Sequence, residues 1–153
     1  MGYMNALKLK ILSYYKQQIQ DKEDAFRDMI AALTEGASND AKGSAGDKHE
    51  TALSMMHLEQ EKLNSKLNEI LEQKAVLEKI DGTALSKRII LGSLVKTNNM
   101  YLFLSTALPK IIIEDITVFA LSPKSPLGSM LIGKQLGDEF ELNSKHYKIE
   151  DCV

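Results

Sequence analysis

The chain has 153 residues and a formal net charge of −2, with 44% hydrophobic and 26% charged residues. This balance is typical of a folded globular protein, and it excludes a global basic field that would draw the chain to nucleic acid or to an anionic membrane. The only cysteine, Cys152, excludes an internal disulfide and is typical of a reducing compartment. No apolar run is long enough to cross a bilayer, and the N-terminus lacks a secretion signal, so we expect a cytoplasmic protein with no membrane partner.

The first half of the sequence carries two apolar seams with a repeat of seven residues. One lies between about Asn5 and Thr34, and the other between about Asp47 and Lys79. Their repeating positions are Leu12, Ile19, Phe26 and Leu33, then Met56, Leu63, Ile70 and Leu77. A repeat of seven predicts long helices that pair along a narrow seam, as in a coiled coil.

The segment Glu35–Gly46 between the two seams consists mainly of small and polar residues, including three glycines. Such residues cannot bury an apolar face, and they favour a turn. We therefore predict that residues 1–80 form an antiparallel helical hairpin, with its tip at about residues 36–50. A seam that is satisfied within one hairpin requires no second chain, so we expect a monomer.

After Asp81-Gly82 the pattern changes from helical to extended. Segments rich in β-branched and aromatic residues predict strands; they lie at residues 88–95, 100–104, 110–119, 138–142 and 146–149. Asn143-Ser144 predicts a turn. A short helix interrupts these segments, so residues 81–153 are predicted to form an α+β domain with an antiparallel sheet.

That short helix has clear boundary signals. Ser125 is a predicted N-cap, and Pro126 stands at the first helical position, where its missing N–H costs nothing. Gly133 is placed to end the helix, and Gly137-Asp138 to turn the chain into the next strand.

Asp47 and Glu50 stand three residues apart at the start of the second helix, so both carboxylates lie on the same side of its first turn. An acidic N-cap followed by Glu three residues later approximates a capping box. The same pair could hold part of the shell of a hard cation such as Mg²⁺, with a partner supplying the remaining ligands. Spacing alone favours the cap and leaves both readings open.

Two motifs resemble those of the Gre transcript-cleavage and elongation factors. Residues 125–138 (SPLGSMLIGKQLGD) are similar to the family's C-terminal signature, and Gly46, Asp47, Glu50 and Ala52 fall on its hairpin-tip motif. The resemblance implies an FKBP-like second domain and a tip that enters the secondary channel of RNA polymerase. There Asp47 and Glu50 would assist the polymerase's own catalytic centre through a shared Mg²⁺, and backtracked RNA would be cut.

By the same resemblance, the chain would bind no cofactor tightly, would act on nascent RNA only through the polymerase, and would be no enzyme alone. The resemblance also implies a polymerase-binding segment around the short helix. Its residues are Ser122, Pro123, Ser125, Pro126, Leu127, Gly128, Gly133 and Lys134.

The chain departs from the tip motif at Thr51, Leu53 and Ser54, where the family has Asn, Glu and Tyr. These departures favour an alternative within the family, a channel-binding modulator without cleavage activity. A coiled-coil scaffold or chaperone unrelated to polymerase is the alternative from another class.

Overall fold

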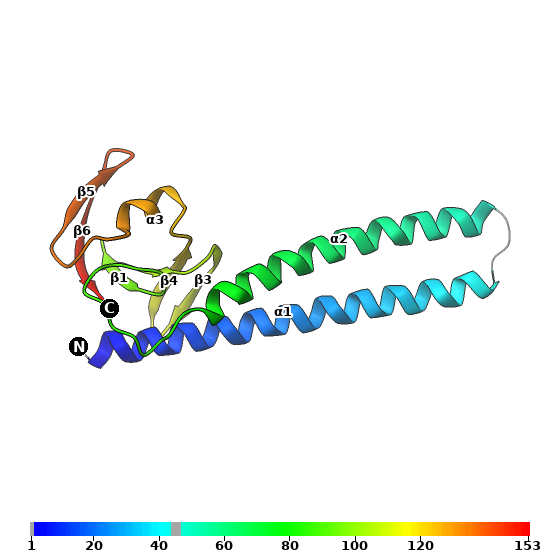
Figure 1. The fold of residues 1–153 in the computed structure, drawn as a ribbon, viewed down its shortest axis with the longest axis horizontal. Coiled ribbons are helices and arrows are strands. Elements are labelled where there is room, and N and C mark those ends of the chain that lie inside the picture. Colours follow the sequence, from blue (N-terminus) through cyan, green and yellow to red (C-terminus); the bar gives the residue numbers. More distant parts are fainter. Residues whose placement is uncertain (1, 44–46) are drawn as a thin grey trace. The chain divides into compact units, whose positions relative to one another are not determined.

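The computed structural model describes residues 2–43 and 47–153, with side chains described for 2–36 and 50–153. Two long helices, α1 (Gly2–Gly43) and α2 (Asp47–Glu78), come first in the chain (Figure 1). Six strands and one short helix, α3 (Pro126–Leu131), follow. The strands are β1 (Leu94–Thr97), β2 (Met100–Leu104), β3 (Leu108–Ile113), β4 (Ile116–Leu121), β5 (Glu139–Leu142) and β6 (Lys145–Cys152). The predicted two-domain α+β class is confirmed.

The chain separates into two compact units. Gln17–Lys74 form a helical unit, while Met1–Lys16 and Ala75–Val153 together form a sheet unit. The first turns of α1 and the last turn of α2 thus belong to the sheet unit. The predicted domains, 1–80 and 81–153, stay a prediction.

In the helical unit, α1 and α2 lie side by side and antiparallel (Figure 1). The amide of Gln60 donates to the hydroxyl of Thr34 at 2.9 Å. The seam positions of this unit are the shielded ones, since Ile19 and Ile70 are buried and Phe26 and Leu63 are half-buried. The predicted seven-residue seam is therefore confirmed.

The sheet unit contains one six-stranded sheet in the order β3-β4-β2-β1-β6-β5. Its neighbouring strands are antiparallel except β2 and β4, which pair in parallel from Tyr101–Val118 to Leu104–Leu121. The parallel pair arises because the β3–β4 hairpin folds back with its second strand against β2. A purely antiparallel sheet was expected; the local pattern of a strand does not reveal which neighbour it pairs with.

Three hairpins close through two-residue turns whose residues all have positive φ. The turns are Asn98-Asn99, Glu114-Asp115 and Asn143-Ser144. Positive φ at both positions is the geometry of a type I′ turn, whose twist matches that of the flanking strands. The predicted Asn143-Ser144 turn is confirmed. Glu114-Asp115 divides the segment 110–119, expected as one strand, into β3 and β4.

Gly92 explains why the predicted strand at 88–95 starts only at Leu94. Its φ is +93°, and a Cβ there would lie 2.8 Å from Cγ2 of Ile80. The chain turns sharply at this close approach, in a backbone conformation that only glycine adopts without strain.

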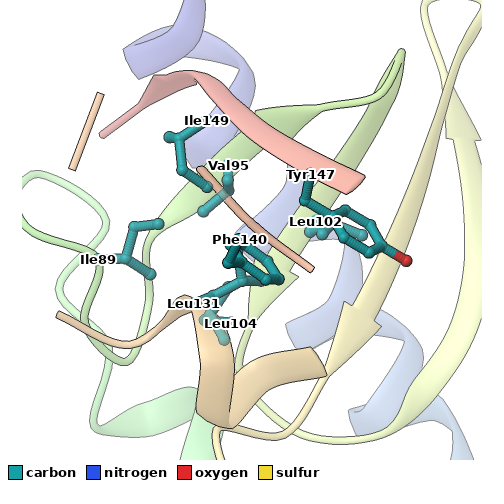
Figure 2. Close-up of a cluster of buried hydrophobic side chains, with 8 residues drawn as sticks. All are labelled: Ile89, Val95, Leu102, Leu104, Leu131, Phe140, Tyr147 and Ile149. Atoms are coloured by element: carbon teal, nitrogen blue, oxygen red, sulfur yellow. The ribbon is translucent and has the colours of Figure 1, made fainter. Parts of the chain in front are cut away.

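The core of the sheet unit lies between α3 and the sheet. Figure 2 labels eight of its side chains, namely Ile89, Val95, Leu102, Leu104, Leu131, Phe140, Tyr147 and Ile149. The rings of Phe140 and Tyr147 stack with centroids 5.0 Å apart. α3 contributes Leu131, so the short helix is part of this core.

The start of α1 contributes a second group of buried side chains to the sheet unit, apart from the cluster beside α3. Leu7, Ile11 and Tyr15 are almost completely buried. The ring of Tyr15 stacks on Phe103 at 6.1 Å, and its hydroxyl donates to the carbonyl of Pro109 at 2.8 Å. Burial raises the pKa of Tyr15 to about 12, so the hydroxyl stays protonated and keeps donating.

Lys8 is buried beside these residues and donates from Nζ to the carbonyl of Ala84 at 2.8 Å. Burial lowers the pKa of Lys8, and the charge of Asp81 partly opposes this effect.

Within the described residues, no helix is both long and apolar enough to cross a membrane.

Candidate functional sites at the start of α2 and around α3

The first candidate site is the acidic pair at the start of α2. Asp47 is the first residue of this helix, directly after the connection from α1. Glu50 lies three residues further, in the first turn, and its side chain is exposed. Gly46 and the side chain of Asp47 lie outside the described part of the chain, so the predicted pairing of the two carboxylates stays a prediction.

The residues after the pair differ in exposure. Thr51, Ala52 and Ser54 are exposed, whereas Leu53 is half-buried. Since the tip motif has Glu at the position of Leu53, this departure removes a carboxylate and places an apolar side chain there.

The chemistry of the acidic pair fits part of a magnesium site. Carboxylate oxygens are ligands that Mg²⁺ prefers, but the ion requires six ligands in octahedral geometry. Two carboxylates leave most of the shell to water and to a partner. Among the residues whose side chains are described, which do not include Asp47, no group of three or more His, Cys, Asp and Glu side chains could hold a metal by itself.

The second candidate site is the segment from Ser122 to Lys134 that carries α3. Ser125 is the N-cap, as predicted: its Oγ accepts from the N–H of Gly128 at 3.1 Å and donates to the carbonyl of Ser122 at 2.7 Å. Pro126 is the first helical residue. Ser122, Ser125 and Gly128 thus form a closed hydrogen-bonded turn that starts the helix.

Gly128 is buried inside that turn. A Cβ at this position would lie 2.0 Å from the carbonyl oxygen of Ser122 and 2.8 Å from Oγ of Ser125. The close approach of two backbone segments therefore requires glycine here, whatever else the segment binds.

The end of α3 is tied to the segment before β1. Gly133 has φ +85°, and its N–H donates to the carbonyl of Ile89 at 2.8 Å. The N–H of Ile89 donates in return to the backbone carbonyl of Lys134 at 2.8 Å. Nη1 of Arg88 donates to the carbonyl of Gly133 at 2.9 Å. Gly133 ends the helix, as predicted.

The eight predicted partner-binding residues differ in what they offer to a partner. Gly128 is buried, and Ser122, Pro123, Ser125, Leu127 and Lys134 are half-buried, which leaves Pro126 and Gly133 exposed. The ammonium of Lys134 lies 5.4 Å from the ring centroid of Phe140, where the π face stabilises the cation. The serines and Gly128 have a clear structural role, and Pro126, Gly133 and Lys134 remain accessible.

Sequence reasoning missed exposed aliphatic side chains in and near this segment. Ile90, Ile132 and Leu136 are 49%, 40% and 62% exposed. The hydrogen bonds between Ile89 and residues 133–134 bring the first two into neighbouring segments. No local signal reveals them, because an apolar residue in a strand-like or helical segment is ordinarily assigned to the core.

Sequence reasoning also missed Glu23 of α1, which is buried in the helical unit. Oε1 accepts from Nζ of Lys74 at 2.7 Å, and Oε2 accepts from Nε of Arg27 at 2.8 Å. Hydrogen bonds from Lys74 and then Arg27 lower the pKa of Glu23. The spacing of Glu23 and Arg27, four residues apart on one helix, was the available signal.

No family model matches the chain, and no curated protein matches it. A solved structure described as that of the transcription factor Gfh1 is 15% identical, covers 90% of this chain and 92% of its own, and superposes with a TM-score of 0.35. A likeness this weak carries no argument about function.

Proposed function

We propose that this chain is a Gre-type transcription elongation factor that binds RNA polymerase. In this proposal the hairpin tip enters the secondary channel and stimulates cleavage of backtracked RNA by the polymerase. The observation that carries the proposal is the location of the acidic motif. Asp47 and Glu50 stand in the first turn of α2, where the chain has just turned back between two long antiparallel helices.

The chemistry assigned to the tip follows from its donor set. Asp47 and Glu50 supply hard carboxylate oxygens, and the polymerase and the RNA supply the other ligands of a shared Mg²⁺. When bound, that ion helps to activate water and to stabilise the charge that develops at the scissile phosphate. The two carboxylates hold and orient the shared ion, and the chain alone is inactive because the substrate and the main catalytic metal belong to the polymerase.

The sheet unit takes the second role, attachment to the polymerase through an FKBP-like domain. The segment around α3 supports this assignment, because Pro126, Gly133 and Lys134 are accessible on a turn held rigid by the Ser125 cap and by the bonds to Ile89. A preorganised surface pays less ordering entropy on binding than a flexible one.

A second candidate, a polymerase-channel modulator without cleavage activity, is favoured by one observation. Thr51, Leu53 and Ser54 replace the polar and aromatic residues that follow the acids in the tip motif, and Leu53 is half-buried. Both candidates bind polymerase and differ only in what the tip does there.

The test is RNA cleavage in a backtracked elongation complex with the cognate polymerase and Mg²⁺. Wild type should shorten the RNA, and D47N/E50Q should lose at least about a hundredfold in cleavage rate, a loss typical of removing a stabilising group from a charged transition state. The affinity of the variant for polymerase should stay unchanged. The matched control is E59Q/E61Q, which removes two exposed carboxylates elsewhere on α2 and should cut RNA normally.

The remaining outcomes decide between the alternatives. Binding without cleavage by wild type would establish the modulator and return Asp47 and Glu50 to a capping role. Absence of binding to polymerase would overturn the proposal and favour the scaffold or chaperone reading.

A further inference from the structure

The helical unit buries few side chains, and one of them is charged. Of its residues with described side chains, the buried ones are Ile19, Glu23, Leu67 and Ile70. A carboxylate is thus one member of a set of four. Glutamate is rarely found at such positions unless it is paired, because moving its charge out of water is costly.

Glu23 is paired through both of its carboxylate oxygens. Its side chain is 9% exposed, against 28% for Lys74 and 54% for Arg27. Lys74 comes from the opposite helix, while Arg27 stands one turn further along α1. The bond to Lys74 therefore joins α1 to α2, and the bond to Arg27 satisfies the second oxygen from the same helix.

A buried ion pair of this kind contributes little net stability, because desolvation offsets the attraction between the charges. Removing its partner is costly, because the remaining charge is then buried alone. The main effect of such a pair is to penalise every arrangement in which the charges do not meet.

The apolar seams alone do not distinguish the native register of the two helices from a shifted one. Both helices repeat their seam residues every seven positions, so a shift of α2 along α1 by seven residues again places apolar side chains against apolar ones. Such a shift moves the helices by about 10 Å. Residues 35–46 are mainly small and polar, so their sequence does not fix the position of the turn between the helices.

The charges do discriminate between these arrangements. A shift of seven residues brings Glu23 level with Leu67 in one direction, or past Glu78, the last residue of α2, in the other. A pairing of α1 with the α1 of a second copy does not contain Lys74. In each alternative Glu23 loses its bond to Lys74.

We propose that Glu23, bonded to Lys74 and Arg27, is the residue that selects both the partner and the register of α1 in the helical hairpin. It excludes shifted and intermolecular pairings that the apolar seam alone would allow. This inference concerns the architecture of the hairpin and does not depend on the proposed function in transcription.

The experiment compares wild type with E23L/K74L, both in a C152S background that removes the natural thiol. A T34C/Q60C cysteine pair reports the register, since the native side chains there are hydrogen-bonded at 2.9 Å. Wild type should oxidise to one intramolecular disulfide. In E23L/K74L the yield should fall about twofold or more, as expected when a second arrangement becomes equally populated. The thermal midpoint of E23L/K74L should be equal or higher.

A second readout uses spin labels at M29C and L58C, two exposed positions on opposite helices. Wild type should give one interspin distance and E23L/K74L more than one, or a dimer by sedimentation velocity. The charge-swapped variant E23K/R27E/K74E restores the pairs and should recover the wild-type pattern. K66E/E69K swaps an exposed pair of α2 and should change nothing.

The inference is overturned if E23L/K74L keeps the wild-type disulfide yield, a single interspin distance and the monomeric state. That result would mean that packing in the sheet unit sets the register of the helices unaided. It is overturned equally if K66E/E69K disturbs pairing as much as E23L/K74L does, because the effect would then reflect helix charge in general.

Discussion

Among the residues around α3, Gly128 has a structural role that the geometry of the turn explains. Because Gly128 has no side chain, the carbonyl oxygen of Ser122 can occupy the space that a Cβ atom would otherwise fill. The Ser125 hydroxyl then bridges Ser122 and Gly128. Much of a motif that resembles a family signature can thus be explained by the turn that it builds.

We predict that Gly128→Ala destabilises the protein by about 2 kcal/mol or more, since an added methyl group must displace backbone in a packed turn. Thermal unfolding followed by circular dichroism measures the change. Ser129→Ala, one residue along on the exposed side of α3, is the control and should cost less than about 1 kcal/mol. Equal stability of Gly128→Ala and wild type would mean that the turn relaxes easily and that glycine here serves another purpose.

At the scale of elements, α1 and α2 pair through a seam that contains a charged cluster at Glu23. Because Lys74 and Arg27 lower the pKa of Glu23, the charged form is favoured in the folded state. The contribution of Glu23 to stability is complete above its unfolded pKa, for which 4.5 is the ordinary value, and is lost as the pH falls through the lower folded value.

We therefore predict that the difference in stability between wild type and Glu23→Gln is largest at neutral pH and disappears in acid. Urea unfolding from about pH 7 to about pH 2.5 measures it. Glu69→Gln, which alters an exposed residue of α2, should follow the wild-type curve throughout. A Glu23→Gln curve parallel to wild type across the whole range would show that the charge of Glu23 is not linked to folding.

For the molecule as a whole, the sheet unit is built from two separate parts of the chain, one before and one after the helical unit. The sheet unit is completed by Met1–Lys16, which contribute Leu7, Ile11 and Tyr15 to its core. The unit therefore joins the two ends of the chain, and the helical unit is inserted between them.

We predict that a fragment of residues 81–153 does not fold cooperatively by itself. Without α1, Phe103 loses the ring of Tyr15, and the carbonyl of Pro109 loses its hydroxyl donor. Loss of several fully buried side chains exceeds the marginal stability of a small domain. Amide dispersion in a nuclear magnetic resonance spectrum and a thermal melt, each compared with the full chain, measure folding. A sharp melt of the fragment would support the predicted boundary near Asp81 as an independent domain boundary.

Local chemistry by itself determined the helices, the cap at Ser125 and one of the hairpin turns of this protein. The seven-residue seam, the Ser125 cap with Pro126, and the turn at Asn143-Ser144 depend on neighbours a few residues away, and all three are present. The division of residues 110–119 was missed because Glu114, the first residue of the turn, is an uncommon choice for positive φ.

The candidate sites were determined by sequence only in part. The acidic motif was located on the first turn of α2 from its spacing, whereas the pairing of its carboxylates stays a prediction. The exposed aliphatic side chains around Ile132 could not be foreseen, because exposure depends on which segments cover a residue.

Only the tertiary structure decided three further features: the parallel pairing of β2 with β4, the packing of α1 into the sheet unit, and the burial of Glu23 against Lys74. Each joins residues far apart in the chain. Hydrophobic pattern and backbone propensity act over a few residues, so they define elements and their faces. The choice of partner for each face comes from the free energy of the whole assembled core, which no local segment contains.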